Sequence, residues 1–176
     1  MSEPAPTLAM DLPERLDQIR ADMKDEYLQD HHTPWIVGFS GGKDSTILLQ
    51  LVFEMLLELP PSKRLRHVHV LSNDTLVESP ILQNFIDKTL DQVRHAAEGL
   101  PLPMTVVKTT PSPHHTFWVN LIGRGYPAPT RLFRWCTDRM KIRPTSHYIK
   151  TKISEAGDAI LLLYSELLDI RLRSEA

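Results

Sequence analysis

Six consecutive residues, SGGKDS at positions 40–45, combine two glycines, two hydroxyls, a lysine and a carboxylate. Glycines allow backbone N–H groups to turn toward an anion without a Cβ in the way. Lysine adds a full positive charge, the serines can donate to phosphate oxygens, and the aspartate can cap a helix or help to hold Mg²⁺. The stretch predicts a phosphate-binding loop, whose expected ligands are Ser40, Gly41, Gly42, Lys43, Asp44 and Ser45.

This loop differs from the common Walker A loop. That motif needs a glycine, four further residues and then Gly-Lys-Ser/Thr, because its hydroxyl must meet Mg²⁺ directly after the lysine. Here Asp44 follows Lys43, and Val37 stands where the first glycine would be. The simpler alternative is a glycine turn with a capping side chain. An apolar strand-like run before the loop and an apolar helix-like run after it favour phosphate binding, since helix N-termini attract anions.

The elements that must position this loop alternate between strands and helices. Four apolar runs have the composition of strands, at residues 35–39, 66–74, 104–110 and 158–164. Apolar spacing predicts helices over 12–30, 45–59 and 80–97, with Asp11 and Ser79 as caps, a short helical piece over 115–122, and a helix from Cys136 that Pro144 interrupts. This order predicts an α/β fold, a parallel sheet with helices on both faces. Ligands of such sheets bind at the carboxyl ends of the strands, here the loops after Phe39, Leu71 and Thr110.

Composition and charge narrow the class of protein. The chain has 176 residues, 41% of them hydrophobic, a net charge of −2 and one cysteine, which excludes internal disulfides. It has no apolar run of about 18 residues and no secretory signal pattern, so we expect a cytoplasmic protein that does not enter a membrane. Residues 124–143 hold six basic residues against one acidic residue, which predicts a nearby anionic ligand, the alternative being a solvated helix face.

Two stretches carry a resemblance to a known family. SGGKDS resembles the signature of the PP-loop, or N-type, ATP pyrophosphatases, which include GMP synthetases, tRNA-thiolating enzymes, adenylyl-sulfate and phosphoadenylyl-sulfate reductases and DndC-type proteins of DNA phosphorothioation. LIGRGYPAPTRLFRWCTDRMKIRP at 121–144, together with NDTLVESP at 73–80, is most similar to the DndC type. The resemblance covers residues 35–163 approximately. It implies a Rossmann-like, adenine nucleotide α-hydrolase-like domain over 35–176, preceded by an N-terminal tail and helix over 1–34.

The resemblance also implies a reaction. Such an enzyme cleaves ATP to AMP and pyrophosphate with Mg²⁺ and transfers sulfur to DNA, with a cysteine desulfurase as sulfur donor and other DNA-modification subunits as partners. Lys43 would stabilise the leaving pyrophosphate, Asp44 would hold Mg²⁺, and Asn73 and Asp74 would lie near the adenosine. Four basic residues would face the phosphates of ATP or of the DNA backbone, with Arg139 assigned to catalysis: Arg131, Arg134, Arg139 and Lys141.

Cys136 has three interpretations. The resemblance implies a catalytic, sulfur-handling residue or a single ligand of an iron–sulfur cluster, whose remaining cysteines would come from another chain. The alternative is a small buried core residue. For Trp118 and Trp135, core packing is preferred over stacking on a base. His67 and His69 share one face of a strand, and their spacing supplies no third metal ligand.

The sequence departs from the family after DAILLL. The DndC-type pattern continues into a Gly-x-Arg-x-x-Glu-Ser-like segment and further cysteines, whereas this chain reads YSELLDIRLRSEA. We therefore expect a C-terminally truncated domain whose catalysis is incomplete. Two alternatives remain: an adenylyl-sulfate or phosphoadenylyl-sulfate reductase, which needs a cysteine near its C-terminus that the last 40 residues lack, and a non-catalytic nucleotide-binding subunit.

Overall fold

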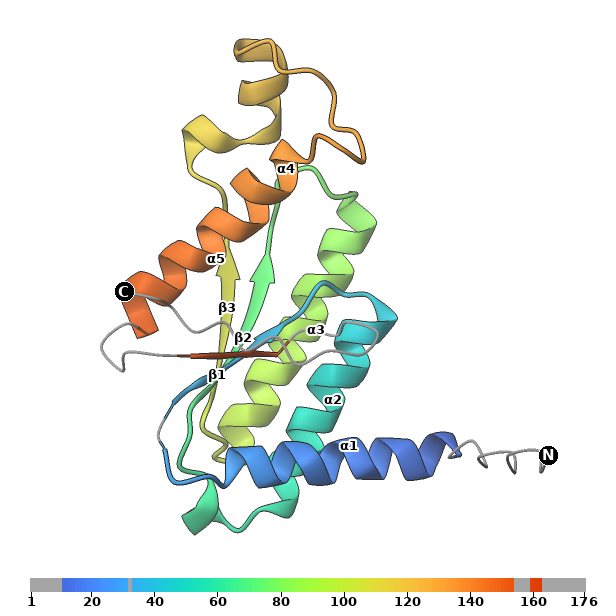
Figure 1. The fold of residues 1–176 in the computed structure, drawn as a ribbon, viewed down its shortest axis with the longest axis vertical. Coiled ribbons are helices and arrows are strands. Elements are labelled where there is room, and N and C mark those ends of the chain that lie inside the picture. Colours follow the sequence, from blue (N-terminus) through green and yellow to red (C-terminus); the bar gives the residue numbers. More distant parts are fainter. Residues whose placement is uncertain (1–10, 32, 154–158, 163–176) are drawn as a thin grey trace, which may run out of the picture.

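A four-stranded, all-parallel sheet forms the centre of the molecule (Figure 1). The structure is a computed structural model that describes residues 11–31, 33–153 and 159–162. The strands are β1 (Trp35–Gly38), β2 (Val68–Asn73), β3 (Met104–Thr109) and β4 (Ile160–Leu162), in the order β3-β2-β1-β4. The predicted α/β class with a parallel sheet is confirmed. The rest of the predicted fourth strand, and the segment YSELLDIRLRSEA, lie outside the described residues.

Three long helices lie where the sequence predicts them, and two of them begin at their predicted caps. They are α1 (Leu12–Tyr27), α2 (Lys43–Glu58) and α3 (Pro80–Gly99). The side chain of Asp11 accepts from the Leu12 N–H, and that of Ser79 accepts from the Leu82 N–H, as expected for N-caps. Helix α1 ends three residues earlier than predicted, and α2 begins two residues earlier, at Lys43.

Alternating residues of β1 divide the core between the two faces of the sheet. Trp35 and Val37 are fully buried in the larger cluster, with side chains of α1, α2 and α3. Ile36 points the opposite way, where Leu71 and the partly buried Tyr148 and Ile149 join it. Period-two alternation of this kind, with apolar residues on both faces, is what a covered parallel strand requires. The prediction of helices on both faces is confirmed.

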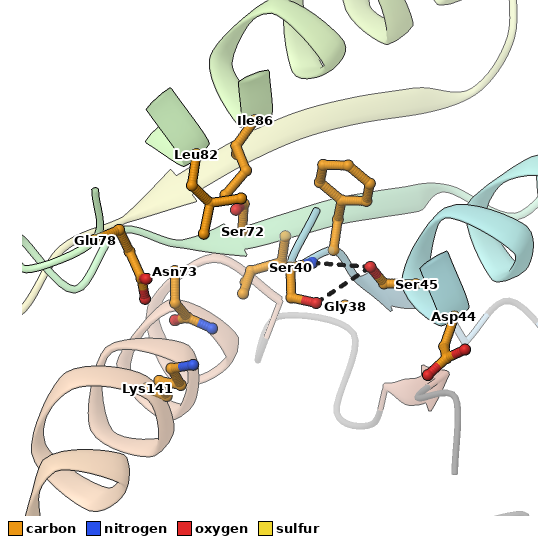
Figure 2. Close-up of a pocket in the computed structure, with 12 residues that line it drawn as sticks. Gly38, Ser40, Asp44, Ser45, Ser72, Asn73, Glu78, Leu82, Ile86 and Lys141 are labelled. Atoms are coloured by element: carbon orange, nitrogen blue, oxygen red, sulfur yellow. Dashed lines mark hydrogen bonds between the residues drawn. The ribbon is translucent and has the colours of Figure 1, made fainter. Parts of the chain in front are cut away.

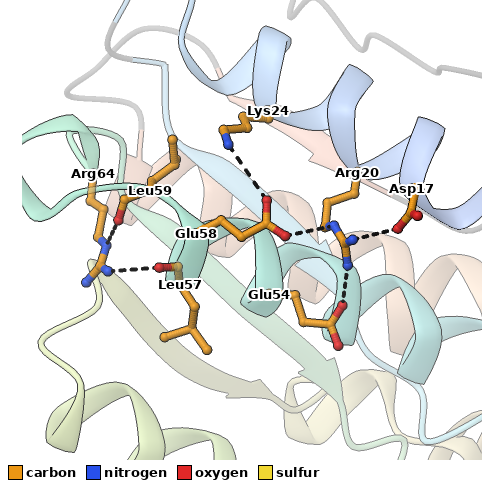
Figure 3. A network of polar contacts seen from close by, with 8 residues as sticks. All are labelled: Asp17, Arg20, Lys24, Glu54, Leu57, Glu58, Leu59 and Arg64. Carbon is orange, nitrogen blue, oxygen red and sulfur yellow. Dashed lines mark hydrogen bonds and ion pairs between the residues drawn. The ribbon is translucent and has the colours of Figure 1, made fainter.

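Ion pairs attach α1 to α2 (Figure 3). The Arg20 guanidinium lies 2.8 Å from Glu54 and 3.0 Å from Glu58, and Lys24 lies 3.7 Å from Glu58. Beneath them the Tyr27 hydroxyl donates to the Arg66 carbonyl at 2.6 Å, and the Tyr27 ring packs edge-on against Trp35. The N-terminal helix therefore packs against α2 and also reaches the sheet, through the contact of Tyr27 with Trp35.

A run of helical turns crosses the other face of the sheet. It alternates between α and π geometry through α4 (Trp135–Thr137), η4 (Asp138–Ile142), α5 (Arg143–Tyr148) and η5 (Ile149–Ile153). The prediction that Pro144 interrupts this helix is wrong. The Arg143 N–H donates to the Asp138 carbonyl across a π turn, so Pro144 falls in the first turn of α5, where its missing N–H costs little.

Residues 113–134 form an arm that projects beyond β3, at the upper end of Figure 1. It contains η2 (Pro113–His115) and η3 (Val119–Gly123) and then runs as a loop to α4, while the short turn η1 (Pro61–Lys63) follows α2 elsewhere. The helical piece predicted over 115–122 corresponds to the turns ending at Gly123. None of the helices in the described part of the chain is long and apolar enough to cross a membrane.

Candidate nucleotide-binding site

A pocket of about 530 Å³ opens at the carboxyl edge of β1 and β2 (Figure 2). This volume lies within the roughly 300–1,000 Å³ of typical small-molecule sites. The residues that line it are Gly38, Phe39, Ser40, Asp44, Ser45, Leu71, Ser72, Asn73, Glu78, Leu82, Ile86 and Lys141. The loops after Phe39 and Leu71, which the sequence singled out as ligand-binding, both contribute to this pocket.

Gly41 adopts a backbone conformation that few other residues tolerate. Its φ is +76°, and a Cβ placed there would lie 2.7 Å from Cγ1 of Ile86. A left-handed φ is costly for residues with a Cβ, and a contact this short is a steric clash. Gly42 differs, because its φ is −79° and an added Cβ would lie 3.6 Å from Ser40 Oγ. Gly41 is therefore the position at which the loop requires glycine.

Hydroxyl groups hold the loop in shape. The Ser40 N–H donates to Ser45 Oγ at 3.2 Å, and Ser45 Oγ donates to the Gly42 carbonyl at 3.0 Å. Thr46 Oγ1 donates to the same carbonyl at 2.9 Å. The first N–H groups of a helix have no acceptor within it, so the amides at the start of α2 are available to an anion, which the helix dipole also favours. This arrangement suits the oxygens of a pyrophosphate.

The opposite wall is built where β2, β3 and α5 meet. Asn73 Oδ1 accepts from Thr109 Oγ1 at 2.7 Å and from Thr145 Oγ1 at 3.0 Å. Four residues before Thr145, the Lys141 side chain lines the pocket beside Asn73 (Figure 2). Glu78 lines the same end and accepts from Thr75 Oγ1 at 3.2 Å. The pocket thus has a hydroxyl-rich and glycine-rich side, and a side that carries one ammonium and one carboxylate.

The structure brings together only part of the predicted site. Five predicted ligands line the pocket, namely Ser40, Asp44, Ser45, Asn73 and Lys141. Gly41, Gly42 and Lys43 belong to the same loop without lining the pocket, and the Lys43 side chain is exposed. Asp74 is engaged elsewhere, since its carboxylate accepts from the Leu76 N–H and lies 3.2 Å from Lys108 Nζ.

Other predicted residues belong to the arm and to the helical run at its base. Arg131 and Arg134 are exposed on the arm, whereas Cys136 and Arg139 lie partly buried on α4 and η4, and none of the four lines the pocket. Four further residues line the pocket although the sequence did not predict them as ligands: Glu78, Ser72, Leu82 and Ile86. Leu82 and Ile86 lie at apolar positions of the predicted helix over 80–97, and no local signal shows that these side chains also reach the pocket.

Arg139 has partners inside the protein. Its Nη1 donates to Oδ1 of the fully buried Asn120 at 3.0 Å, and its Nη2 donates to the Tyr126 hydroxyl at 2.7 Å, with the guanidinium 4.9 Å from the centre of the Tyr126 ring. Trp135 stacks on Phe117 nearby and donates from Nε1 to the Pro127 carbonyl. These contacts make Arg139 a support of the arm.

The two tryptophans differ in burial. Trp135 is 6% exposed, so the expectation of core packing is confirmed for this residue. Trp118 is 56% exposed, so the same expectation is wrong there. Its position in the projecting arm, away from the sheet, accounts for the difference (Figure 1).

The pocket fits Mg²⁺, whereas the described residues do not fit an iron–sulfur cluster. Mg²⁺ is commonly held by one or two carboxylates together with substrate phosphates, and Asp44 offers a carboxylate at the pocket wall. A cluster needs several thiolates, and Cys136 is the one cysteine of the chain. Within the described residues, no group of three or more His, Cys, Asp or Glu side chains could hold a metal ion.

Of the two histidines, His69 lies on β2 and packs against Tyr148 of α5, whereas His67 precedes the strand and is exposed. Tyr148 OH lies 2.9 Å from His69 Nδ1, and His67 Nε2 lies 2.7 Å from Thr105 Oγ1. Burial, with a smaller contribution from the His67 ring, lowers the pKa of His69 to about 4. A neutral ring is therefore favoured at this position near pH 7.

No protein-family model matches this chain, and a comparison with curated proteins gives no match.

Proposed function

We propose that this protein is an ATP pyrophosphatase-type sulfurtransferase of DNA sulfur modification, which cleaves ATP to AMP and pyrophosphate to activate its acceptor for phosphorothioation. The observation that carries the proposal is the SGGKDS loop at the carboxyl edge of a parallel sheet, with Gly41 in its left-handed conformation beside a pocket of about 530 Å³. Both the loop type and its position suit a nucleotide whose pyrophosphate is the leaving group.

The loop and the opposite wall of the pocket have different roles in ATP cleavage. Loop amides and the Ser40 and Ser45 hydroxyls bind the β- and γ-phosphates, and Lys43 adds charge as the pyrophosphate leaves. Lys141 approaches from the opposite wall, where its ammonium can contact the α-phosphate or the acceptor. Asp44 would hold Mg²⁺, which neutralises phosphate charge when it is bound. An acceptor oxygen attacks the α-phosphate and the bond to pyrophosphate breaks. Sulfide, released from the persulfide of a cysteine desulfurase by a thiol reductant, then displaces AMP.

A second candidate function is a nucleotide-binding subunit that does not catalyse the reaction itself. The observation that favours it is the position of Cys136, the one thiol of the chain, which does not line the pocket. The same observation weighs against a reductase of adenylyl sulfate or phosphoadenylyl sulfate, because that chemistry needs a thiol at the nucleotide. In the leading proposal the sulfur comes from the desulfurase, so the position of Cys136 does not exclude it.

Product analysis tests the proposal. The protein is incubated with ATP and Mg²⁺, with and without a cysteine desulfurase and DNA, and the nucleotides are separated by chromatography. We expect AMP and pyrophosphate, their loss in Lys43→Ala, and unchanged activity in Lys63→Ala, a substitution of an exposed lysine on η1. ADP and phosphate as products would contradict the proposal. Calorimetric binding of ATP without any AMP would support the nucleotide-binding subunit.

A further inference from the structure

The last residues of the arm, 130–134, form a tight turn just before α4, and this turn displays apolar side chains to solvent. Backbone hydrogen bonds of 3.2 Å join Thr130 and Phe133 in both directions, and Thr130 Oγ1 also accepts from the Phe133 N–H at 3.1 Å. Leu132 is 100% exposed and Phe133 is 45% exposed. Single exposed apolar residues are common, but a hydrogen-bonded turn that holds two adjacent ones outward is suited to contact with another molecule.

The charged side chains in and around this turn are all positive. Arg131 and Arg134 flank the two apolar residues, and both are exposed. The sequence has no acidic residue between Glu98 and Asp138, so the whole arm lacks carboxylates. Asp138, the first acid beyond the arm, is paired with Arg143 at 2.8 Å. A surface with cations and apolar groups but without carboxylates is complementary to a polyanion that also offers apolar faces.

Hydrogen bonds between the arm and the helical run that follows it fix the position of this turn. Asn120 is fully buried and bonds to Arg139, which also holds the Tyr126 hydroxyl. The Trp135 indole donates a hydrogen bond from Nε1 to the Pro127 carbonyl, which lies seven residues before Arg134 in the chain. A preorganised surface loses less conformational entropy on binding than a flexible loop does.

We infer that this turn, residues 130–134, binds a nucleic-acid strand. Arg131 and Arg134 contact backbone phosphates, while Leu132 and Phe133 lie against bases. Nucleic acids combine the required features, since arginines neutralise phosphates and apolar or aromatic side chains insert between bases or stack on them. Stacking needs open base faces, so single-stranded or unstacked DNA is favoured over an undistorted duplex. The inference rests on the proposed function in one respect, the identity of the acceptor as DNA, and it separates the surface for the acceptor from the pocket for ATP.

Fluorescence anisotropy tests the inference in the absence of ATP. The probe is a labelled single strand of about 20 nucleotides, compared with its duplex, over roughly 50 to 200 mM KCl. Three paired variants are compared with the wild type: Arg131→Ala with Arg134→Ala, Leu132→Ala with Phe133→Ala, and, as a control with the same loss of charge, Lys63→Ala with Lys88→Ala. Both control lysines are exposed and lie outside the arm. Circular dichroism checks that every variant is folded.

Substitution of both arginines should make the slope of log affinity against log salt less steep by about 1.4, because two phosphate contacts are lost. The Leu132 and Phe133 pair should weaken binding about tenfold and leave that slope unchanged. Equal affinity and slope in all variants would overturn the inference. So would binding to vesicles of anionic lipid with none to nucleic acid, or an absence of nucleic-acid binding altogether. The anisotropy measurement contains no ATP, so its outcome is independent of the pyrophosphate-release assay. Failure of pyrophosphate release would not contradict nucleic-acid binding, and normal release would not support it.

Discussion

Thr145 Oγ1 donates a hydrogen bond of 3.0 Å to Asn73 Oδ1, and this contact joins residues 72 positions apart in the chain. The same oxygen of Asn73 accepts from Thr109 Oγ1, so β2, β3 and α5 meet at one side chain. The contact also sets the rotation of the helical run that carries Lys141 into the pocket. A strand end and a distant helix thus build one wall of the site together.

Thr145→Val keeps the shape of this side chain and removes the hydrogen bond. We expect a loss of about 1 kcal/mol in the free energy of unfolding, measured in urea, because one partly buried hydrogen bond is lost. We also expect weaker ATP binding in calorimetry, as Lys141 loses its fixed position. Thr151→Val is the control, since that hydroxyl bonds within its own helical turns, to His147 and Tyr148. Equal ATP affinity in the two variants would show that the contact does not position the site.

Gly41→Ala and Gly42→Ala form a matched pair in the phosphate loop. The first places a Cβ at φ +76° and 2.7 Å from Ile86, so we expect a loss of about 2 kcal/mol or more in stability and no measurable ATP binding. The second keeps φ near −79°, and its Cβ would make an ordinary van der Waals contact with Ser40 Oγ at 3.6 Å, so its cost should stay below about 1 kcal/mol. Thermal unfolding and calorimetry measure both effects. Wild-type behaviour of Gly41→Ala would contradict the loop geometry.

Arg139→Met separates a supporting role from a catalytic one. The substitution removes two hydrogen bonds of a charged donor and leaves Oδ1 of the buried Asn120 with only the longer contact, 3.4 Å, from Arg124 Nη1. We therefore expect about 3 kcal/mol of destabilisation and faster proteolysis of the arm. Arg134→Met, at an exposed position, should change stability by less than about 0.5 kcal/mol. Calorimetry with ATP should give similar affinities for the two folded variants. If Arg139→Met were fully stable but inactive in AMP formation, Arg139 would instead belong to the chemistry.

Stability should fall in acid because of His69. Its pKa in the folded protein, about 4, lies below the ordinary value of 6.5, so the unfolded chain binds more protons between these pH values. The stabilisation from the neutral ring is present above pH 6.5 and is lost as the pH falls toward 4, by about 3 kcal/mol. Urea unfolding at several pH values measures this slope, which His69→Gln should flatten. An equal slope in His69→Gln would assign the acid sensitivity to other groups.

The sequence by itself determined the local parts of this protein. The strand, loop and helix around SGGKDS, the caps at Asp11 and Ser79 and the parallel α/β class all follow from short-range sterics and apolar periodicity. The need for glycine in this loop is of the same kind, because φ is a property of one residue. Even the position of the pocket after β1 and β2 was predictable, since it follows from the class of the sheet.

Only the tertiary structure decided which distant residues share the site. Six basic residues stand close together over 124–143, yet Lys141 is the one that lines the pocket, Arg139 supports the arm, and Arg131 and Arg134 are exposed on it. These outcomes depend on the rotation of the helical run over the sheet, which the π turns before Pro144 and the contact of Thr145 with Asn73 set. Spacing along the chain carries no record of such contacts, because they join elements whose separation in sequence is unrelated to their distance in the fold.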